Sequence, residues 1–375
     1  MLLEPEKPWT KCIALVGILK AAAFAVSEWS SMGLPDASDS RLAALTRWVF
    51  DDLGFSGGRI AVASADASFR RYFRVTRGDD SYIVMDAPPD KENVVPFVNV
   101  ARMLAGWRLN VPIILAQDPE RGFLLLSDLG SRQYLEELAD ERAADHLYGD
   151  ALGALATMQS ADGAAARTLP HYTDALLLRE MDLMPEWFLG RHLGVKATSE
   201  EKSMLQALYG TLLQNARAQP QTFVHRDYHS RNLLVTDDQN PGILDFQDAV
   251  WGPATYDLVS LLKDCYIEWP AAQVRAWALQ YRERLLERNF PLDASEAQFI
   301  RWFDLIGLQR HIKVLGIFCR LNYRDGKIHY LKDLPRVLRY THEAAAAYAE
   351  TAPFAEFIEK RVEAEFLRAQ ERAIP

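Results

Sequence analysis

The chain has only three cysteines among its 375 residues, Cys12, Cys265 and Cys319. They are odd in number and widely spaced, which excludes a disulfide framework and the ligand spacing of a zinc site. A reducing cytoplasm fits this composition. Long apolar runs are lacking too, because the stretch at residues 12–26 is interrupted by Lys20 and is too short for a comfortable membrane span. We therefore expect a cytoplasmic protein with no stable membrane association.

An excess of basic charge is also missing. The formal net charge is −9, which argues against nucleic acid as the main partner. Half of the residues are hydrophobic and a quarter are charged, as in ordinary globular proteins. A chain of this length indicates one large or two medium domains.

The most informative feature is a set of polar residues placed between short apolar runs. Asp227 lies five residues before Asn232, and Asp245 follows eighteen residues after Asp227. Phosphoryl transfer from ATP uses such a set, because one carboxylate orients the attacking hydroxyl and accepts its proton while an asparagine and a second carboxylate hold Mg²⁺. The spacing matches the kinase catalytic loop (H-R-D-x-x-x-x-N) followed by a D-F-x metal site. The alternative, that His225 and Asp227 only cap a turn, leaves the other two residues unexplained.

Apolar spacing divides the chain into a β-rich part and a helical part. After a helix at residues 41–53, capped by Asp39 or Ser40, strands are predicted at 59–64, 72–76, 82–86, 113–117 and 122–126, with a hairpin turn at 77–80 and a helix at about 93–107. Later helices are predicted at 133–158, 175–193, 199–218, 254–265, 271–289, 295–318, 329–348 and 354–372. The predicted fold class is α+β, a bilobal protein-kinase-like fold with a small β-rich N-lobe and a large helical C-lobe. The expected divisions are a nucleotide-binding N-lobe (32–128), a C-lobe with the catalytic loop and substrate site (129–353) and a C-terminal helix (354–375).

Residues 1–31 precede this pattern. Lys7 and Lys11 followed by the apolar stretch resemble a weak signal peptide, and a dispensable helix is a second interpretation. We favour a third, an upstream extension from a misplaced start codon, because Met32 opens a polar stretch just before the first convincing helix.

The glycines with which protein kinases cover the ATP phosphates are absent from residues 65–74. Ser68 and nearby backbone N–H groups are candidates to bind phosphate oxygens instead. Arg70 or Arg71 would add charge-assisted hydrogen bonds. The alternative is that both arginines are surface charges.

The strand lysine that pairs with the phosphates is missing as well, since Met85 stands at its expected position. Either an arginine of the preceding hairpin replaces this lysine, or the chain is a catalytically inactive relative. The complete set of catalytic and metal-binding residues favours the first interpretation.

The loop at residues 225–232 resembles that of the aminoglycoside/choline kinase-like superfamily, whose members phosphorylate small-molecule hydroxyls. The chain more closely resembles the N-acetylmuramate/N-acetylglucosamine anomeric sugar kinases of bacterial cell-wall recycling, over about residues 40–345. The segments that carry this resemblance are 68–74, 83–89, 122–130, 245–253 and 310–318. Met85 belongs to the pattern of that subfamily, so the resemblance implies that the missing lysine is compatible with activity.

The resemblance implies transfer of the ATP γ-phosphoryl group to the anomeric (C1) hydroxyl of an amino sugar, giving a sugar 1-phosphate for UDP-sugar synthesis and peptidoglycan recycling. Asp227 would be the catalytic base, and Asn232 and Asp245 would bind Mg²⁺. Asp128 and Leu129 would lie at a hinge where backbone groups bind adenine. Asp257 resembles a structural aspartate of the family, although a charge at a helix N-terminus explains it equally well.

Substrate choice depends on charge, because N-acetylmuramate carries a lactyl carboxylate. Arg310 and Lys313 share one face of a predicted helix and form a candidate carboxylate site, unless that face is simply solvated. Further candidate substrate residues are His229, Arg231 and Asp248.

A cationic substrate is an alternative, because three acidic residues could bind it, namely Asp248, Asp264 and Glu268. The chain would then be another small-molecule kinase, of the aminoglycoside or choline/homoserine-like kind. A non-catalytic ATP-binding regulator is the remaining alternative. The absence of an evident Ala-Pro-Glu segment counts against a protein kinase.

Overall fold

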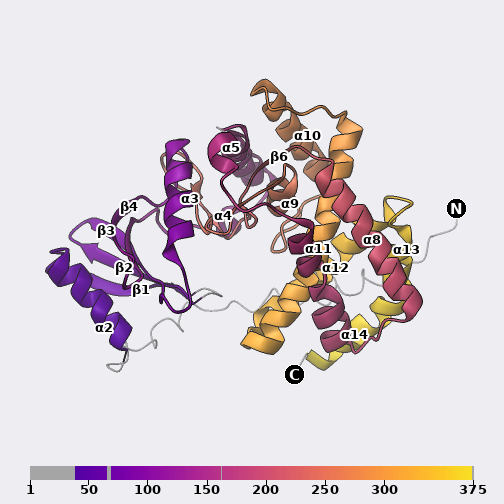
Figure 1. The fold of residues 1–375 in the computed structure, drawn as a ribbon, viewed down its shortest axis with the longest axis horizontal. Coiled ribbons are helices and arrows are strands. Elements are labelled where there is room, and N and C mark those ends of the chain that lie inside the picture. The colour runs from indigo at the N-terminus through magenta and orange to yellow at the C-terminus, as the bar shows by residue number, and fades with distance from the viewer. Residues whose placement is uncertain (1–38, 66–68, 162, 374–375) are drawn as a thin grey trace. The chain divides into compact units, whose positions relative to one another are not determined.

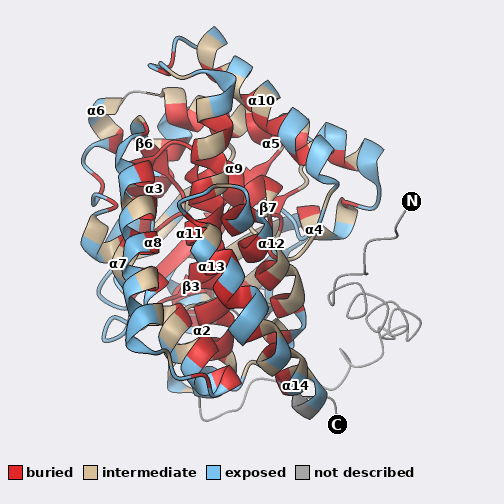
Figure 2. Cartoon of the chain, turned by 90° about the vertical axis from the view of Figure 1, so that its right-hand side faces the viewer, coloured by how far each residue is buried: buried red, intermediate tan, exposed pale blue. Residues whose placement is uncertain are grey.

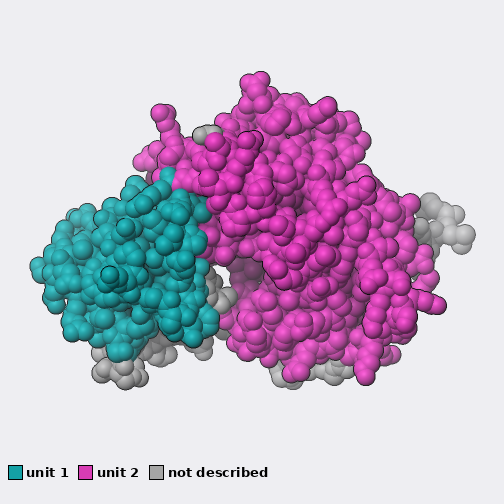
Figure 3. Space-filling model, in the orientation of Figure 1, with its two compact units in different colours: residues 1–102, 112–129 teal, residues 103–111, 130–375 magenta. Residues whose placement is uncertain are grey.

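The computed structural model describes residues 39–65, 69–161 and 163–373. The predicted N-terminal extension (1–31) and Ser68 lie outside these residues. The chain divides into two compact units (Figure 3). Unit 1 runs to Arg102 and also contains Pro112–Leu129, whereas unit 2 contains Met103–Val111 and the chain from Gly130 onward.

Unit 1 is built on a five-stranded antiparallel sheet with the strand order β1-β2-β3-β5-β4. Its strands are β1 (Arg59–Ala65), β2 (Arg71–Arg77), β3 (Asp80–Asp86), β4 (Ile114–Asp118) and β5 (Phe123–Ser127) (Figure 1). Between β2 and β3 the chain turns at Gly78, whose φ of 61° is the left-handed conformation that favours glycine. All five predicted strands and the predicted hairpin are therefore confirmed.

Helix α2 (Ser40–Arg47) covers one face of this sheet. Asp39 caps the helix by accepting a hydrogen bond from the Leu42 N–H at 3.0 Å, and a π-helical turn (Trp48–Asp52) extends it. Alternate residues of the strands point toward the helix. The shared core contains Leu42, Leu45, Trp48, Val49, Phe73, Val75, Val84, Phe123 and Leu125. The next helix along the chain is α3 (Val94–Gly106).

Unit 2 is mainly helical. Its longer helices are α5 (Glu141–Ser160), α7 (Asp174–Met181), α8 (Ser199–Arg217), α9 (Tyr256–Leu262), α10 (Ala271–Glu287), α11 (Glu296–Asp325), α12 (Leu334–Ala346) and α14 (Glu363–Ala373). Shorter elements are α4 (Tyr134–Glu137), α6 (Gly163–Ala166), a 3₁₀ helix (Ile328–Asp333) and α13 (Ala352–Phe357). Together with the sheet of unit 1, these helices confirm the α+β fold class.

Several of the predicted helices are divided in the structure, among them the one at 329–348, where a 3₁₀ helix precedes α12. The segment at 133–158 breaks between α4 and α5, where Asp140 starts a new helix by accepting a hydrogen bond from the Ala143 N–H. The segment at 175–193 continues after α7 as a π-helical stretch (Met184–Leu193) with Pro185 in its first turn, and proline lacks the N–H of a regular helix. The segment at 354–372 contains a π-helical turn between α13 and α14.

Helix α11 lies at the centre of unit 2 and contacts α8, α9 and α12 (Figure 1). Most of its side chains are buried (Figure 2). It continues to Asp325, past the predicted end at residue 318, and stops before Gly326, which has a φ of 69°. At Gly316 the helix approaches the backbone of Leu183 so closely that a Cβ atom would lie 2.3 Å from the Leu183 carbonyl carbon. The helix therefore passes where only a glycine fits.

Two short antiparallel pairs of strands lie within unit 2. Strand β6 (Gln221–Val224) pairs with β9 (Val250–Pro253), and β7 (Leu233–Leu234) pairs with β8 (Gly242–Ile243). The predicted catalytic loop at residues 225–232 joins β6 to β7, and residues 244–249 join β8 to β9. Both connections that carry the motif are thus held at each end by a strand.

Cys265 and Cys319 are buried and form no disulfide. Burial raises the pKa of the Cys265 thiol to about 12, and it also raises that of Cys319. Among the residues that the structure describes, no helix combines the length and the apolar character needed to cross a bilayer.

Candidate active site

Two buried aspartates fix the backbone of the catalytic loop. The carboxylate of Asp257, in the first turn of α9, accepts hydrogen bonds from the N–H groups of His225 at 2.6 Å and Arg226 at 2.9 Å. Asp264 accepts from both the N–H and the hydroxyl of Ser230, at 3.0 and 2.5 Å. Asp257 is thus both a helix N-terminal charge and an anchor of the loop.

Asp264 is one of the acids that were considered as ligands of a cationic substrate. It is 1% exposed and serves as the second anchor of the catalytic loop. The anchoring function of Asp264 was missed from the sequence, because no local pattern links it to Ser230, which lies 34 positions earlier.

Asp227 projects from this loop beside a group of cations. Its side chain keeps 40% of its surface exposed, and the nearest guanidinium nitrogen of Arg310 lies 4.0 Å from its Oδ1. Desolvation opposes ionisation of the carboxyl, but the positive charges of Lys313 and Arg310 outweigh it and hold the pKa of Asp227 well below its usual range. Asp227 is therefore an ionised carboxylate that can accept a hydrogen bond from a hydroxyl.

The imidazole of His225 supports the same loop from inside. It is fully buried, and its Nε2 lies 2.9 Å from the carbonyl oxygen of Leu244. Burial lowers the pKa of His225 to about 4. The neutral ring therefore joins the catalytic loop to the segment that carries Asp245.

Asn232 and Asp245, the predicted metal ligands, lie next to each other. The Asn232 Nδ2 donates to the backbone oxygen of Asp227 at 2.9 Å and lies 3.4 Å from the Asp245 Oδ2. Gln247 donates to the Asp245 Oδ1 at 2.7 Å, and its own buried Oε1 has no partner in the described part of the chain. An amide oxygen, a carboxylate and an unsatisfied buried oxygen form the kind of hard-oxygen surroundings that Mg²⁺ prefers, so these residues fit the ion.

Two residues of the motif have left-handed backbone conformations, Arg226 with a φ of 77° and Asp245 with a φ of 61°. Such conformations cost free energy in residues other than glycine and are found preferentially at functional sites. One lies in the catalytic loop beside Asp227, and the other is the predicted metal ligand itself, so both set the direction of side chains in the site.

Arg310 and Lys313, the predicted carboxylate site, lie on α11 and are only 4% and 5% exposed. They do not form a solvated helix face. The Nε of Arg310 donates to the Ser260 hydroxyl at 2.7 Å. The Nζ of Lys313 lies 3.0 Å from a carboxylate oxygen of Glu180 and 3.1 Å from the Tyr256 hydroxyl. Both cations thus lie near Asp227 but already have partners within the protein.

Glu180 of α7 joins several of these charges and was not singled out from the sequence. Its carboxylate lies 2.5 Å from a guanidinium nitrogen of Arg226 and also accepts a hydrogen bond from the Tyr172 hydroxyl. Burial opposes its ionisation, but Lys313 and Arg226 lower its pKa. Glu180 is therefore the counter-ion of the two cations.

The other candidate substrate residues lie in unit 2 as well. The ring of His229 meets Tyr266 edge-on, with 5.5 Å between ring centroids, and the guanidinium of Arg231 lies 3.8 Å from the centroid of the same ring. Asp248 is exposed and lies 3.4 Å from the amide nitrogen of Gln247. Among the other acids considered for a cationic substrate, Glu268 pairs with Arg339 at 2.5 Å.

The predicted nucleotide residues that the structure describes lie in unit 1. Arg70 pairs with Glu92 at 3.0 Å, whereas Arg71 pairs with the fully buried Asp86 at 2.5 Å and with Asp39. Neither arginine is therefore an unpaired surface charge.

Met85 is fully buried in β3. The carboxylate of Asp128 accepts hydrogen bonds from Arg74 at 2.6 Å and from the Ser81 hydroxyl at 2.5 Å. Leu129 is the last residue of unit 1 before the chain enters unit 2.

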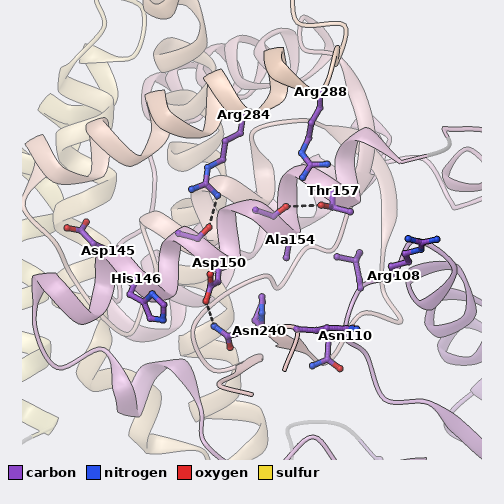
Figure 4. Close-up of a pocket in the computed structure, with 15 residues that line it drawn as sticks. Arg108, Asn110, Asp145, His146, Asp150, Ala154, Thr157, Asn240, Arg284 and Arg288 are labelled. Atoms are coloured by element: carbon purple, nitrogen blue, oxygen red, sulfur yellow. Dashed lines mark hydrogen bonds between the residues drawn. The ribbon is translucent and has the colours of Figure 1, made fainter. Parts of the chain in front are cut away.

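A separate cavity of about 670 Å³ lies in unit 2 between α5, α10 and the loop that joins β7 to β8 (Figure 4). Several of its polar groups bind each other across the elements. Arg284 donates to the carbonyl oxygen of Gly149 at 2.6 Å, and Asn240 donates to Asp150 at 2.7 Å (Figure 4). No residue of the catalytic loop lines this cavity, and these hydrogen bonds connect its walls.

Residues 59–296 of this chain match the model of the phosphotransferase enzyme family. A Pseudomonas putida protein named N-acetylmuramate/N-acetylglucosamine kinase is 44% identical over 330 residues, which cover 85% of this chain and 96% of that protein. A Pseudomonas aeruginosa protein of the same name is 49% identical over 296 residues, covering 79% and 86%. Among solved structures, an ADP-bound aminoglycoside phosphotransferase has a TM-score of 0.54 and 16% identity, covering 80% of this chain and 98% of that one. This likeness confirms the kinase-like fold predicted from the sequence.

Proposed function

Because this chain belongs to the phosphotransferase enzyme family, we propose that it is an ATP-dependent kinase acting on the anomeric (C1) hydroxyl of N-acetylmuramate and N-acetylglucosamine. The names of relatives at 44% and 49% identity support these substrates. The sugar 1-phosphate would be used for UDP-sugar synthesis and would return cell-wall sugars to peptidoglycan. The enzyme would work in the cytoplasm, where ATP is available.

One observation supports this chemistry above the others: the motif residues lie together, with Asn232 donating to the backbone of Asp227 and standing 3.4 Å from Asp245. We propose that the ionised Asp227 accepts a hydrogen bond from the sugar hydroxyl and orients its oxygen toward the γ-phosphorus. Because neighbouring cations hold the pKa of Asp227 low, the carboxylate is a weak proton acceptor. Orientation of the hydroxyl is then its first task, and it takes the proton as the new P–O bond forms and the bond between the γ-phosphorus and the bridging oxygen breaks, releasing ADP.

Asn232 and Asp245 would hold Mg²⁺, which neutralises charge on the ATP phosphates when it is bound. In unit 1 we propose that Arg70, positioned by Glu92, replaces the missing strand lysine at the phosphates. The backbone groups of Asp128 and Leu129 would bind the adenine.

The test is ATP consumption by the full-length protein with Mg²⁺, offered N-acetylmuramate, N-acetylglucosamine, kanamycin and choline in parallel. We expect turnover on the two amino sugars only. Phosphorylation at C1 removes the reducing end, so the reducing-sugar signal should fall in step with ATP consumption.

The control variants are Asp227→Asn and Asp293→Asn, the second of which removes an exposed carboxylate between α10 and α11. Loss of general-base and orienting action should reduce kcat by about 10²- to 10⁴-fold in the first variant and leave the second unchanged. Turnover of kanamycin or choline in place of the sugars would contradict the substrate proposal. Full activity of Asp227→Asn would contradict the proposed mechanism.

A further inference from the structure

Most cations near Asp227 are already neutralised inside the protein. Lys313 and Arg226 share the buried carboxylate of Glu180, at 3.0 and 2.5 Å. Arg310 faces Asp227 itself at 4.0 Å. A substrate carboxylate would have to displace Glu180 or compete with the catalytic carboxylate to bind these groups. They are therefore poor candidates to recognise an acidic substrate.

Arg231 differs from these cations, although it belongs to the same loop. Within the part of the chain that the structure describes, it forms no ion pair, and its side chain is half-buried. Its neighbour Ser230 is anchored to Asp264, and its other neighbour is the metal-ligand candidate Asn232. Asp333 is the acid whose pKa Arg231 influences, and it is already paired with Arg336 at 3.1 Å. Arg231 therefore has a fixed backbone and, among the described residues, no ion-pair partner of its own.

The guanidinium of Arg231 is also held in place. It lies 3.8 Å from the centroid of the Tyr266 ring, within the range of a cation–π contact. The Tyr266 N–H donates to Asp264 at 3.0 Å, so one aspartate fixes both Ser230 and Tyr266. Stacking on an aromatic face leaves the edge nitrogens of a guanidinium able to bind a carboxylate in a bidentate manner.

Aromatic rings continue from this contact. Tyr266 meets Phe318 with 6.1 Å between centroids, and Phe318 meets Tyr330 with 5.1 Å. Phe318 is buried in the core of unit 2, and Tyr266 and Tyr330 pack against that core, so these contacts fix the Tyr266 ring on which the guanidinium lies. A guanidinium held on a fixed aromatic ring suits a ligand that carries a carboxylate.

We propose that Arg231 is the residue that binds the lactyl carboxylate of N-acetylmuramate, with Tyr266 holding its guanidinium in place. This proposal rests on the proposed function and assigns its substrate specificity to one side chain. N-acetylglucosamine lacks the carboxylate, so Arg231 acts on one of the two substrates only.

The test compares kcat/KM on both sugars for Arg231→Gln. A charge-assisted hydrogen bond of ordinary strength is lost, so kcat/KM for N-acetylmuramate should fall about 10- to 100-fold. The value for N-acetylglucosamine should stay within about twofold, because it involves no such bond. That second activity also verifies that the variant is folded. Arg217→Gln, which removes an exposed arginine of α8, should change neither value.

A neutral substrate completes the comparison. The methyl ester of N-acetylmuramate should be a poor substrate of the unmodified protein. Arg231→Gln should not reduce its turnover further, because the ester already lacks the carboxylate that the guanidinium would bind. An equal fall on both sugars in Arg231→Gln would overturn the carboxylate role and leave the kinase proposal intact. Absence of turnover on either sugar by the unmodified protein would overturn both proposals.

Discussion

Arg70 and Arg71 are neighbours in the chain, yet their guanidinium groups have different partners. Arg70 pairs with Glu92, and both side chains are largely buried, at 11% and 15% exposed. Arg71 binds Asp86, a fully buried carboxylate at the end of β3 that Arg41 also contacts. The first pair resembles the ion pair that positions a phosphate-binding lysine in kinases, whereas the second neutralises a charge inside the unit.

These partners predict different defects for the two arginines. Arg70→Gln should raise the KM for ATP and lower kcat/KM for ATP about 10- to 100-fold, because a charged contact to phosphate is lost, while the melting temperature changes little. Arg71→Gln should lower the free energy of unfolding by about 1–3 kcal/mol, because Asp86 loses one of its two cations. Steady-state kinetics with varied ATP and thermal melting of both variants test this contrast. A reversed pattern, with the ATP defect in Arg71→Gln, would assign the phosphate contact to Arg71.

Some residues of the site can be predicted from the sequence, and others cannot. Asp227, Asn232 and Asp245 follow a fixed spacing, so a linear pattern identifies them. Glu180 is 46 positions from Arg226, and no local pattern indicates that α7 brings it there. The burial of Arg310 and Lys313 also depends on packing, because a helix with basic residues on one face looks solvated until its neighbours are known.

Among the helices, α11 shows most directly how packing is fixed by one residue. Its interior glycine, Gly316, lies against the backbone of Leu183. A glycine inside a helix costs about 1 kcal/mol relative to alanine, so the close approach must compensate for that loss. Backbone atoms cannot rotate away as a flexible side chain can.

Gly316→Ala should therefore lower the free energy of unfolding by about 1–3 kcal/mol through overpacking. The matched control is Gly210→Ala in α8, where an added Cβ would contact nothing within 4 Å. The control should be neutral or stabilising by up to about 1 kcal/mol, because alanine favours the helix. Urea unfolding followed by circular dichroism measures both changes. Equal stability of the two variants would contradict the close packing of α11.

At the level of elements, apolar spacing predicted the strands of unit 1 well, because each strand places alternate residues in the core shared with α2. It did not predict where helices break. The breaks before α5 and after α7 depend on a capping aspartate and on Pro185 within continuous apolar patterns, and the π-helical turn before α14 has no comparable signal. Helix α11 continues past its predicted end at residue 318. The apolar pattern on which the prediction rests weakens there, but the helix itself stops only at Gly326.

In the molecule as a whole, several histidines are buried without charge. Burial lowers the pKa of His225 to about 4 and that of His311 to about 3, and it also lowers that of His229. In the unfolded chain these groups titrate near 6.5. Between that value and the folded pKa, the unfolded chain binds protons that the folded protein does not, so stability falls as the pH decreases.

His225 and His311 should each remove about 1.4 kcal/mol per pH unit below pH 6.5, or roughly 2 kcal/mol at pH 5. Asp257 acts in the opposite direction, because burial raises its pKa to about 7 and its contribution to stability is lost as the pH rises. The informative quantity is therefore the comparison with His311→Gln. The loss of stability between pH 7 and pH 5 should be smaller in the variant by about 2 kcal/mol, as measured by urea unfolding at each pH. An unchanged loss would show that His311 is protonated in the folded protein.

The two buried thiols make unit 2 suitable for site-specific labelling. Maleimide reagents attack thiolates, and Cys265 and Cys319 are both shielded from solvent and kept protonated at neutral pH. A single cysteine placed at an exposed position, for example Lys202→Cys on α8, would react far faster than either of them. With Cys12 replaced by serine, fluorophores or spin labels could then report on substrate binding without replacement of the native cysteines at positions 265 and 319.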